Sequence, residues 1–199
     1  PFPDLMFTEA TPRWTPQHIL CLSLSKLGIP AARTGIVIAD KPVIRALSGV
    51  NAIMNLATGS FGAMLAEPLV RSGEIISMSR EKVQPIYQQK MEKAVAAFRD
   101  AMGEDCPWRV HTPEGAMFLW LWFPELPISS LELYQRLKAR GVLVVSGHYF
   151  FPGLPDEDWR HRHECLRVTY SQDEADVARG LQVIAEEVKR AWRDQGSMV

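Results

Sequence analysis

The strongest constraint on the fold is that short apolar runs alternate with helical patterns along the second half of the sequence. The run 116–123, "AMFLWLWF", has the length of one buried strand, and the runs at 142–145 and 165–170 are also typical of strands. A helical pattern follows the first run over 130–140, and another follows the last run from about 174 onward. These segments predict helices packed on a small sheet.

Both helices carry signals for their start. Ser129 and Glu132 have the spacing of a capping box, in which each side chain bonds to the backbone N–H of the other residue. Ser171 and Glu174 repeat this spacing before the last helix, and Gly141 is placed to end the first one. The last helix is expected to bury one face, which carries Val177, Leu181, Ile184, Val188 and Trp192.

The first half of the chain predicts two neighbouring strands followed by helices. The runs 19–25 and 34–39 are expected to be buried strands, joined by a loop that contains Gly28 and Pro30. Apolar residues then recur at helical intervals after Pro42, and the segment "ATGSFG" (57–62) breaks this helix before a second one. A long pattern with a mixed face follows from Ser72 to Met102, where Pro85 predicts a kink or break.

Composition limits the partners of the protein. The formal charge of −1 is spread along the 199 residues without a long block of one sign, which disfavours binding to nucleic acid or to a membrane surface. No apolar run approaches the length of a membrane span. Cys21, Cys106 and Cys165 are odd in number and irregular in spacing, so we interpret them as reduced thiols of a cytoplasmic protein.

One short stretch, "SLSKLGIPAARTG", concentrates reactive groups at the end of the first expected strand. Ser23 and Ser25 lie two apart, so on a strand they share a face, and ligands of α/β sheets bind at such strand ends. Together with Arg33 they suit a phosphate dianion. A nearby cation and partial burial favour the neutral amine of Lys26, which can attack an aldehyde. Pyridoxal 5′-phosphate (PLP) carries both a phosphate and an aldehyde.

Other interpretations of these letters remain open at this point. A surface lysine after a strand would leave the same sequence. Ser23 to Lys26 also spells Ser-x-x-Lys, the nucleophile motif of penicillin-binding proteins, but their Ser-Asp-Asn and Lys-Thr-Gly motifs are absent. Farther along, His161, His163 and Cys165 alternate and on a strand would share a face, as metal ligands can. A fourth ligand is not evident nearby, so we assign no metal.

The stretch 23–39 resembles the cofactor-lysine segment of class I/II aminotransferases of fold type I. The likeness continues over nearly the whole chain, in order, through "PFPDLMF", "ATPRW", "ILCLSLSKLGIP", "PEGAMFLWLWF", "LYQRLKARGVLVV", "GHYFFPGL" and "LRVTY". The resemblance implies an α/β fold. Residues 1–75 would be the C-terminal part of a PLP-binding large domain, and residues 76–199 the linking helix and a small α+β C-terminal domain.

The resemblance also implies roles for the reactive residues. Lys26 would hold PLP as a Schiff base and then shuttle a proton between Cα of the substrate and C4′ of the cofactor. Ser23, Ser25 and Arg33 match the phosphate-binding positions. Arg167 matches the arginine that binds the α-carboxylate of the substrate. From the residues alone, Arg167 sits in an apolar strand where an unpaired charge is costly; a bound carboxylate is one way to satisfy it, and an internal Asp or Glu is the alternative.

Two further segments have a family interpretation beside a plain one. The three aromatic residues after Gly147 either cover the core or form a wall near the substrate side chain. An apolar wall suits valine or alanine, and Tyr149 and Phe150 are the candidates for it. The segment "TGSFG" (58–62) either reaches the cofactor of a partner subunit or simply breaks a helix.

The implied reaction moves an amino group between valine and pyruvate, giving 2-oxoisovalerate and alanine. The intact enzyme would be a cytoplasmic homodimer acting on small amino acids and 2-oxo acids. The resemblance covers roughly the C-terminal half of the enzyme, so the residues that contact the PLP ring would precede Pro1. The alternatives are another amino donor, such as alanine or an aromatic amino acid, and an inactive structural fragment.

Overall fold

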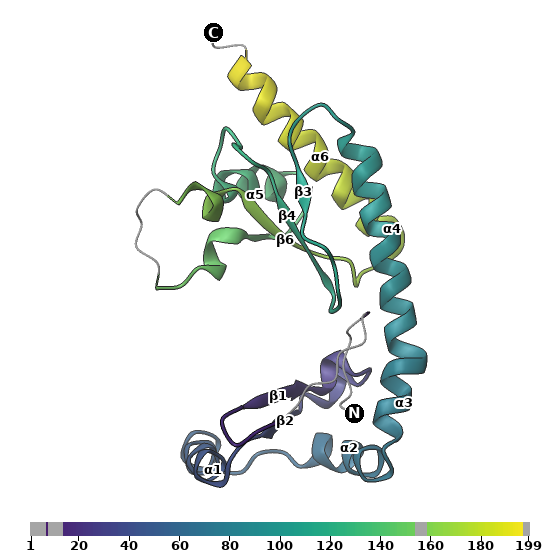
Figure 1. Cartoon of the computed structure of the whole chain (residues 1–199), viewed down its shortest axis with the longest axis vertical. Coiled ribbons are helices and arrows are strands. Elements are labelled where there is room, and N and C mark those ends of the chain that lie inside the picture. The colour runs from purple at the N-terminus through teal and green to yellow at the C-terminus, as the bar shows by residue number, and fades with distance from the viewer. Residues whose placement is uncertain (1–6, 8–13, 154–158, 197–199) are drawn as a thin grey trace. The chain divides into compact units, whose positions relative to one another are not determined.

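The computed structural model describes residues 7, 14–153 and 159–196. The chain divides into two compact units, residues 1–86 and 87–199, and each is described by itself (Figure 1). Across the described ranges, no helix is both long enough and apolar enough to cross a membrane.

The first unit contains a β-hairpin and a series of helical segments. Strand β1 (Leu20–Ser23) pairs antiparallel with β2 (Gly35–Ile38), and Ser23 lies opposite Gly35. Two 3₁₀ turns, η1 (Leu24–Lys26) and η2 (Pro30–Ala32), connect the strands. The segments after the hairpin are α1 (Lys41–Asn55), α2 (Phe61–Ser72), α3 (Glu74–Met78) and the π-helical η3 (Ser79–Val83).

The two strands of the hairpin are less buried than the sequence predicts. The first expected strand ends early, at Ser23, because the next residues turn so that Leu24 and Leu27 enter a small core with Ala66 and Ile75. Along both strands, half-buried residues alternate with exposed ones, as in a hairpin that covers a core with one face only. The prediction of two buried strands is therefore wrong for this chain.

The helices of the first unit follow their sequence signals. Pro42 lies in the first turn of α1, and the carboxylate of Asp40 accepts a hydrogen bond from the N–H of Lys41 at 2.8 Å. The predicted break falls between α1 and α2. The predicted helix over 72–102 is interrupted at η3, where the N–H of Gln84 bonds to the carbonyl of Ser79, directly before Pro85. A π-helical turn is a known cause of helix irregularity.

The second unit is an antiparallel sheet packed against helices. The four strands lie in the order β3-β4-β6-β5. They are β3 (Arg109–Val110), β4 (Phe118–Trp122), β5 (Val145–Ser146) and β6 (Cys165–Thr169), and the helices are α4 (Gln84–Met102), α5 (Ser130–Ala139) and α6 (Glu174–Gly196). Strand β5 shares only Val145 with the predicted strand over 142–145, so that prediction is wrong for 142–144. The N–H of Val142 instead bonds to the carbonyl of Leu137 and completes the end of α5.

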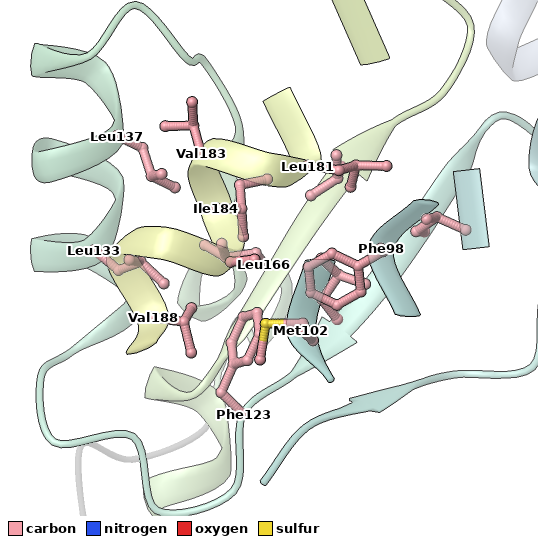
Figure 2. Close-up of a cluster of buried hydrophobic side chains, with 14 of the residues drawn as sticks. Phe98, Met102, Phe123, Leu133, Leu137, Leu166, Leu181, Val183, Ile184 and Val188 are labelled. Atoms are coloured by element: carbon pink, nitrogen blue, oxygen red, sulfur yellow. The ribbon is translucent and has the colours of Figure 1, made fainter. Parts of the chain in front are cut away.

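The sheet has two chemically different faces. One face contributes Leu119, Leu121, Leu166 and Val168 to the main core. Figure 2 shows this core, in which side chains of α4, α5 and α6 meet those of the sheet: Phe98, Met102, Phe123, Leu133, Leu137, Leu181, Val183, Ile184 and Val188. Each fully buried side chain of this size contributes about 1.5–3 kcal/mol. The residues between them, such as Trp120 and Arg167, therefore point to the other face.

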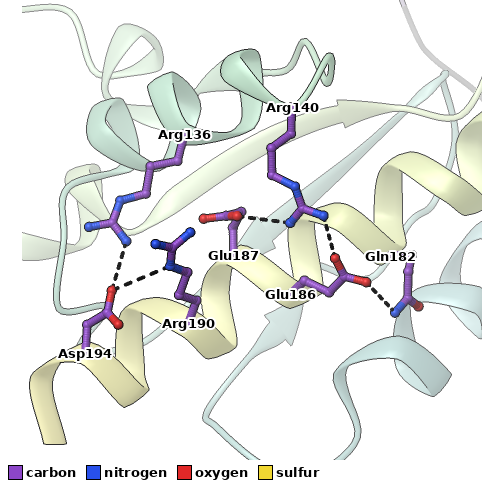
Figure 3. Close-up of polar contacts among 7 residues, drawn as sticks. All are labelled: Arg136, Arg140, Gln182, Glu186, Glu187, Arg190 and Asp194. Carbon is purple, nitrogen blue, oxygen red and sulfur yellow. Dashed lines mark hydrogen bonds and ion pairs between the residues drawn. The ribbon is translucent and has the colours of Figure 1, made fainter. Parts of the chain in front are cut away.

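Ion pairs tie α5 to α6 (Figure 3). The guanidinium of Arg140 binds the carboxylates of Glu186 at 2.6 Å and Glu187 at 3.0 Å, and Arg136 binds Asp194 at 3.5 Å. Exposed pairs of this kind contribute little. Glu187 is different because it is buried, so removing Arg140 would leave a buried carboxylate without this partner.

In only one of the two predicted capping boxes does the expected serine cap the helix. The hydroxyl of Ser129 accepts a hydrogen bond from the N–H of Glu132 at 3.1 Å, as predicted. Helix α6 begins differently, because the carboxylate of Asp173 accepts the bond from the N–H of Ala175 at 3.0 Å. The hydroxyl of Ser171 bonds to Thr169 instead, so the second capping box is wrong.

Candidate functional site

Lys26 is presented by a tight turn at the end of β1. It is the last residue of η1, and its two apolar neighbours Leu24 and Leu27 are buried and anchor the turn. The backbone N–H of Leu24 bonds to the carbonyl of Thr34, which closes the base of the turn at 3.1 Å. Lys26 itself is exposed in this chain. The expected partial burial of the lysine is therefore not found among the described residues.

The same turn brings together a hydroxyl and a guanidinium. Arg33 has a left-handed backbone conformation, with φ of 46°, and its Nη1 donates a hydrogen bond to Oγ of Ser25 at 3.3 Å. Ser23 is the exposed last residue of β1, so the two serines do not share one strand as predicted. Within 14–153 and 159–196, no carboxylate forms an ion pair with Arg33. The pair Ser25 and Arg33 thus fits a phosphate group, which would accept hydrogen bonds from both.

A glycine of α2 lies directly against this turn. A Cβ atom built on Gly62 would collide with the hydroxyl of Thr34 and the carbonyl of Ala32, the residues on either side of Arg33. Gly62 is buried at the start of α2. The segment "TGSFG" therefore has a local packing role, because its last residue allows α2 to approach the loop that carries Arg33.

Arg167 forms the second group of functional interest, on the noncore face of the sheet. It lies in the middle of β6, opposite Trp120 of β4 and Val145 of β5, and is half-buried. Its Cζ atom lies over the ring of Phe118, 4.3 Å from the centroid, and over that of Phe150, at 4.7 Å. In the described part of the chain, Arg167 makes no ion pair with Asp or Glu. The internal carboxylate considered from the sequence is not present there.

The two residues proposed to contact the substrate side chain lie in the turn η4 (Gly147–Phe150). The ring of Phe150 meets Trp120 edge to face, with centroids 5.3 Å apart. Tyr149 is 66% exposed and lies beside His148, with ring centroids 4.0 Å apart. Of the two, Phe150 is the residue whose ring contacts Arg167.

A chain of hydrogen bonds holds the start of η4. The hydroxyl of Ser146 donates to the hydroxyl of Ser130, the first residue of α5, at 2.8 Å, and it also bonds to Nδ1 of His148 at 2.7 Å. Burial lowers the pKa of His148 below its ordinary value, and the nearby positive charges of His163 and Arg162 lower it further.

The metal-site interpretation of "HRHEC" is not supported by the local geometry. His161 and His163 lie in a 3₁₀ turn, η5 (Arg160–His163), rather than on a strand with Cys165. Burial raises the pKa of the Cys165 thiol to about 12, so it is protonated at neutral pH and is a poor metal ligand. Among the residues with a described position, no group of three or more His, Cys, Asp or Glu side chains could hold a metal ion.

Comparison with known proteins identifies the family. The family model for class I and II aminotransferases matches residues 5–184. The chain belongs to the class I and II aminotransferases. Its strands and helices accordingly form part of the α/β fold of fold-type I enzymes, so the comparison with penicillin-binding proteins that Ser-x-x-Lys suggested is not supported.

Individual aminotransferases are similar over almost the whole chain. The valine–pyruvate aminotransferase of Escherichia coli is 44% identical over 98% of the chain, and the chain covers 46% of that protein. The crystal structure of valine–pyruvate aminotransferase from Salmonella typhimurium has a TM-score of 0.87 and 47% identity, over 96% of this chain and 49% of that one. A Psychrobacter arcticum protein, provisionally named an amino-acid aminotransferase, has a TM-score of 0.90 and 47% identity, with coverages of 97% and 44%. The chain thus spans about half the length of these aminotransferases.

The aromatic surface around Arg167 is not among the features predicted from the sequence. In the run 116–123, aromatic residues at 118, 120 and 122 alternate with leucines at 119 and 121. The structure puts the leucines in the core and the aromatic residues on the face that carries Arg167. This period of two was the signal that could have revealed the surface.

We predict that Gly62→Ala destabilises the protein. The added methyl group would collide with the loop that carries Arg33, and overpacking of this kind costs about 1–3 kcal/mol. The free energy of unfolding, measured by urea denaturation, should fall accordingly. Gly59→Ala is the matched control, because nothing lies within 4 Å of a Cβ at Gly59. Equal stability of the two variants would contradict the packing role of Gly62.

A second prediction concerns the pH dependence of stability. The pKa of His148 is lowered in the folded protein from an ordinary value of 6.5, so below pH 6.5 the unfolded chain binds the proton more readily. His148 therefore makes the folded state lose stability as the pH falls below 6.5, whereas above that pH it has no such effect. In urea denaturation between pH 7.5 and 5.5, the variant His148→Asn should lose less stability than the wild type. Parallel pH profiles for the two proteins would show that His148 does not contribute.

Proposed function

We propose that the protein containing this chain is a PLP-dependent aminotransferase that moves an amino group between valine and pyruvate, giving 2-oxoisovalerate and alanine. The family membership and the 44% identity to the E. coli valine–pyruvate aminotransferase support this assignment. The observation that carries it is the guanidinium of Arg167, half-buried in an apolar strand and without a carboxylate partner among the described residues. Amino acids and 2-oxo acids both present a carboxylate, so one arginine serves both substrates.

Four residues of the first unit are proposed to hold the cofactor. Ser23, Ser25 and Arg33 would bind its phosphate, and Lys26 would hold it at its aldehyde end. Bound PLP supplies an electron sink that stabilises negative charge at the substrate's Cα. The contact between Ser25 and Arg33 supports this assignment, since a hydroxyl and a guanidinium at 3.3 Å can both donate to one phosphate. Lys26 also has the chemistry to remove and return the proton at Cα of the substrate.

Residues of the second unit are proposed to bind the substrate. Arg167 takes the α-carboxylate in a bidentate pair. Phe150 and Tyr149 contact the substrate side chain, where an apolar wall offers no partner for a charged group and suits valine or alanine. An aromatic amino acid as the amino donor is the alternative. It is favoured by the aromatic rings beside Arg167, among which those of Phe150 and Trp120 have centroids 5.3 Å apart.

The functional assignment is tested by trapping the cofactor. Borohydride reduction of the protein with PLP should attach the cofactor to the peptide that contains Lys26, as mass spectrometry can show. Lys26→Ala should lose this attachment, and kcat for valine and pyruvate should fall by roughly 100- to 10,000-fold, as when an acid–base group is removed. The control is Lys41→Ala, which changes another exposed lysine.

The following results would change the proposal. Absence of trapped cofactor in the wild type would favour the inactive structural fragment. Trapping at another lysine would overturn the role of Lys26. A higher kcat/KM for phenylalanine than for valine, with pyruvate as the acceptor, would favour an aromatic donor. A higher kcat/KM for alanine than for valine would favour alanine; both donors are then compared with a 2-oxo acid other than pyruvate, because alanine and pyruvate give no net reaction.

We further propose that the protein acts as a cytoplasmic homodimer. The described cysteines are free thiols, as expected where thiols stay reduced. Helix α1 has an apolar face, including Leu47, Val50 and Ile53, yet it has no buried residue. An apolar face of this kind supports a partner surface, which a second copy can supply.

This proposal predicts that a charge on α1 disrupts the dimer. Ile53 is 82% exposed, so Ile53→Glu should not disturb the core of the chain, but it would place a charge within the apolar face. Sedimentation velocity should show a smaller species for this variant than for the wild type. Ser48→Glu is the control, because five residues of helix put Ser48 on a different side of α1. A monomeric wild type, or an unchanged Ile53→Glu variant, would contradict the proposed interface.

A further inference from the structure

We propose that Phe118 and Phe150 are positioning residues for Arg167. Their rings hold its guanidinium, while its N–H groups stay available for the carboxylate of the substrate. The inference rests on the proposed function and extends it, because it names residues that determine how tightly a carboxylate binds.

The first ring is placed by the register of the sheet. Strands β4 and β6 are antiparallel, with Trp120 directly opposite Arg167. Phe118 lies two residues before Trp120, so it is on the same face and is a diagonal neighbour of Arg167. Long side chains reach across such a diagonal, and Cζ of Arg167 is 4.3 Å from the ring centroid of Phe118. The contact therefore follows from strand pairing.

The second ring comes from the turn η4 and is supported from two sides. Phe150 ends this turn, and its ring centroid is 4.7 Å from Cζ of Arg167. Trp120 meets the ring of Phe150 at an interplanar angle of 90°. At the other end of the turn, Ser146 bonds to Ser130 of α5. Packing and hydrogen bonds thus determine where the ring of Phe150 lies.

The chemistry of these contacts differs from that of an ion pair. An aromatic face attracts a cation through its quadrupole and uses none of the five N–H donors of arginine. An Asp or Glu partner would instead occupy the donors that a substrate carboxylate needs. Rings beside the guanidinium also displace water, which strengthens its attraction for an anion. The rings should therefore favour carboxylate binding both before and during the reaction, so their loss should raise KM more than it lowers kcat.

The experiment removes each ring and measures carboxylate binding directly. The probe is 3-methylbutanoate, the valine skeleton without its amino group, and its affinity for the PLP-loaded protein is measured by calorimetry. In Phe150→Leu and in Phe118→Leu, its dissociation constant and the KM for valine should each rise about 3- to 30-fold, the range expected from losing a cation–π contact. In both variants, kcat should change less than KM. Phe150→Tyr keeps an aromatic face and should restore affinity to near the wild-type value.

Phe151→Leu is the matched control. Phe151 is the adjacent aromatic residue, and its ring meets Trp120 and Trp159 rather than the guanidinium. This variant should keep the wild-type affinity for 3-methylbutanoate. A similar loss of affinity in Phe151→Leu would show that general packing of the aromatic cluster matters, and it would overturn the specific role of Phe150.

Two other outcomes would overturn the inference. One is unchanged affinity in the two leucine variants when thermal unfolding shows that they are folded. The other is a fall in kcat alone, at wild-type affinity. Because Phe150 is also proposed to contact the substrate side chain, Phe118→Leu decides between the outcomes, and it does so too if Phe150→Leu does not fold. A wild type that traps no PLP on Lys26 would contradict the proposed function, whereas the binding series, repeated with the protein without PLP, would still test the two rings.

Discussion

The second unit depends on the alternation of side chains along β4 and β6. Leu119, Leu121 and Leu166 close the core that α4, α5 and α6 build, so the residues between them have to lie on the opposite face. That face receives aromatic rings and the single cation Arg167 of β6. A shift of register by one residue would put this cation into the core, where an unpaired charge is prohibitively costly. Core packing therefore also determines the location of the carboxylate-binding candidate.

In the first unit, too, buried apolar residues determine where the polar residues of the candidate site lie. Leu24 and Leu27 are the buried residues of the Lys26 turn, and the polar residues beside them are left outside. Gly62 lets α2 approach closely enough to support the loop that carries Arg33. The contact between Arg33 and Ser25 thus depends on an apolar anchor and on the absence of one methyl group.

Much of the fold was predictable because its signals are local. Pro42 and Ser129 mark helix starts correctly, and the run 116–123 contains its strand. The errors arose where several local solutions compete. Asp173 replaces Ser171 as the cap of α6, and the chain turns between Ser23 and Ser25, so these two serines do not share one strand. The rings around Arg167 could not be located from spacing alone, because their contacts depend on pairing between distant segments.

The hydrogen bonds of Ser146 also determine the tautomer of a nearby imidazole. Ser146 has one hydroxyl proton and donates it to Ser130, so it must accept a hydrogen bond from Nδ1–H of His148. Neutral His148 therefore carries its lone pair on Nε2, and that atom receives the proton on acidification. The link between α5 and η4 survives this protonation. What opposes it is first the burial of the ring, which keeps the pKa of His148 below its ordinary value, and then the positive charges of His163 and Arg162 nearby.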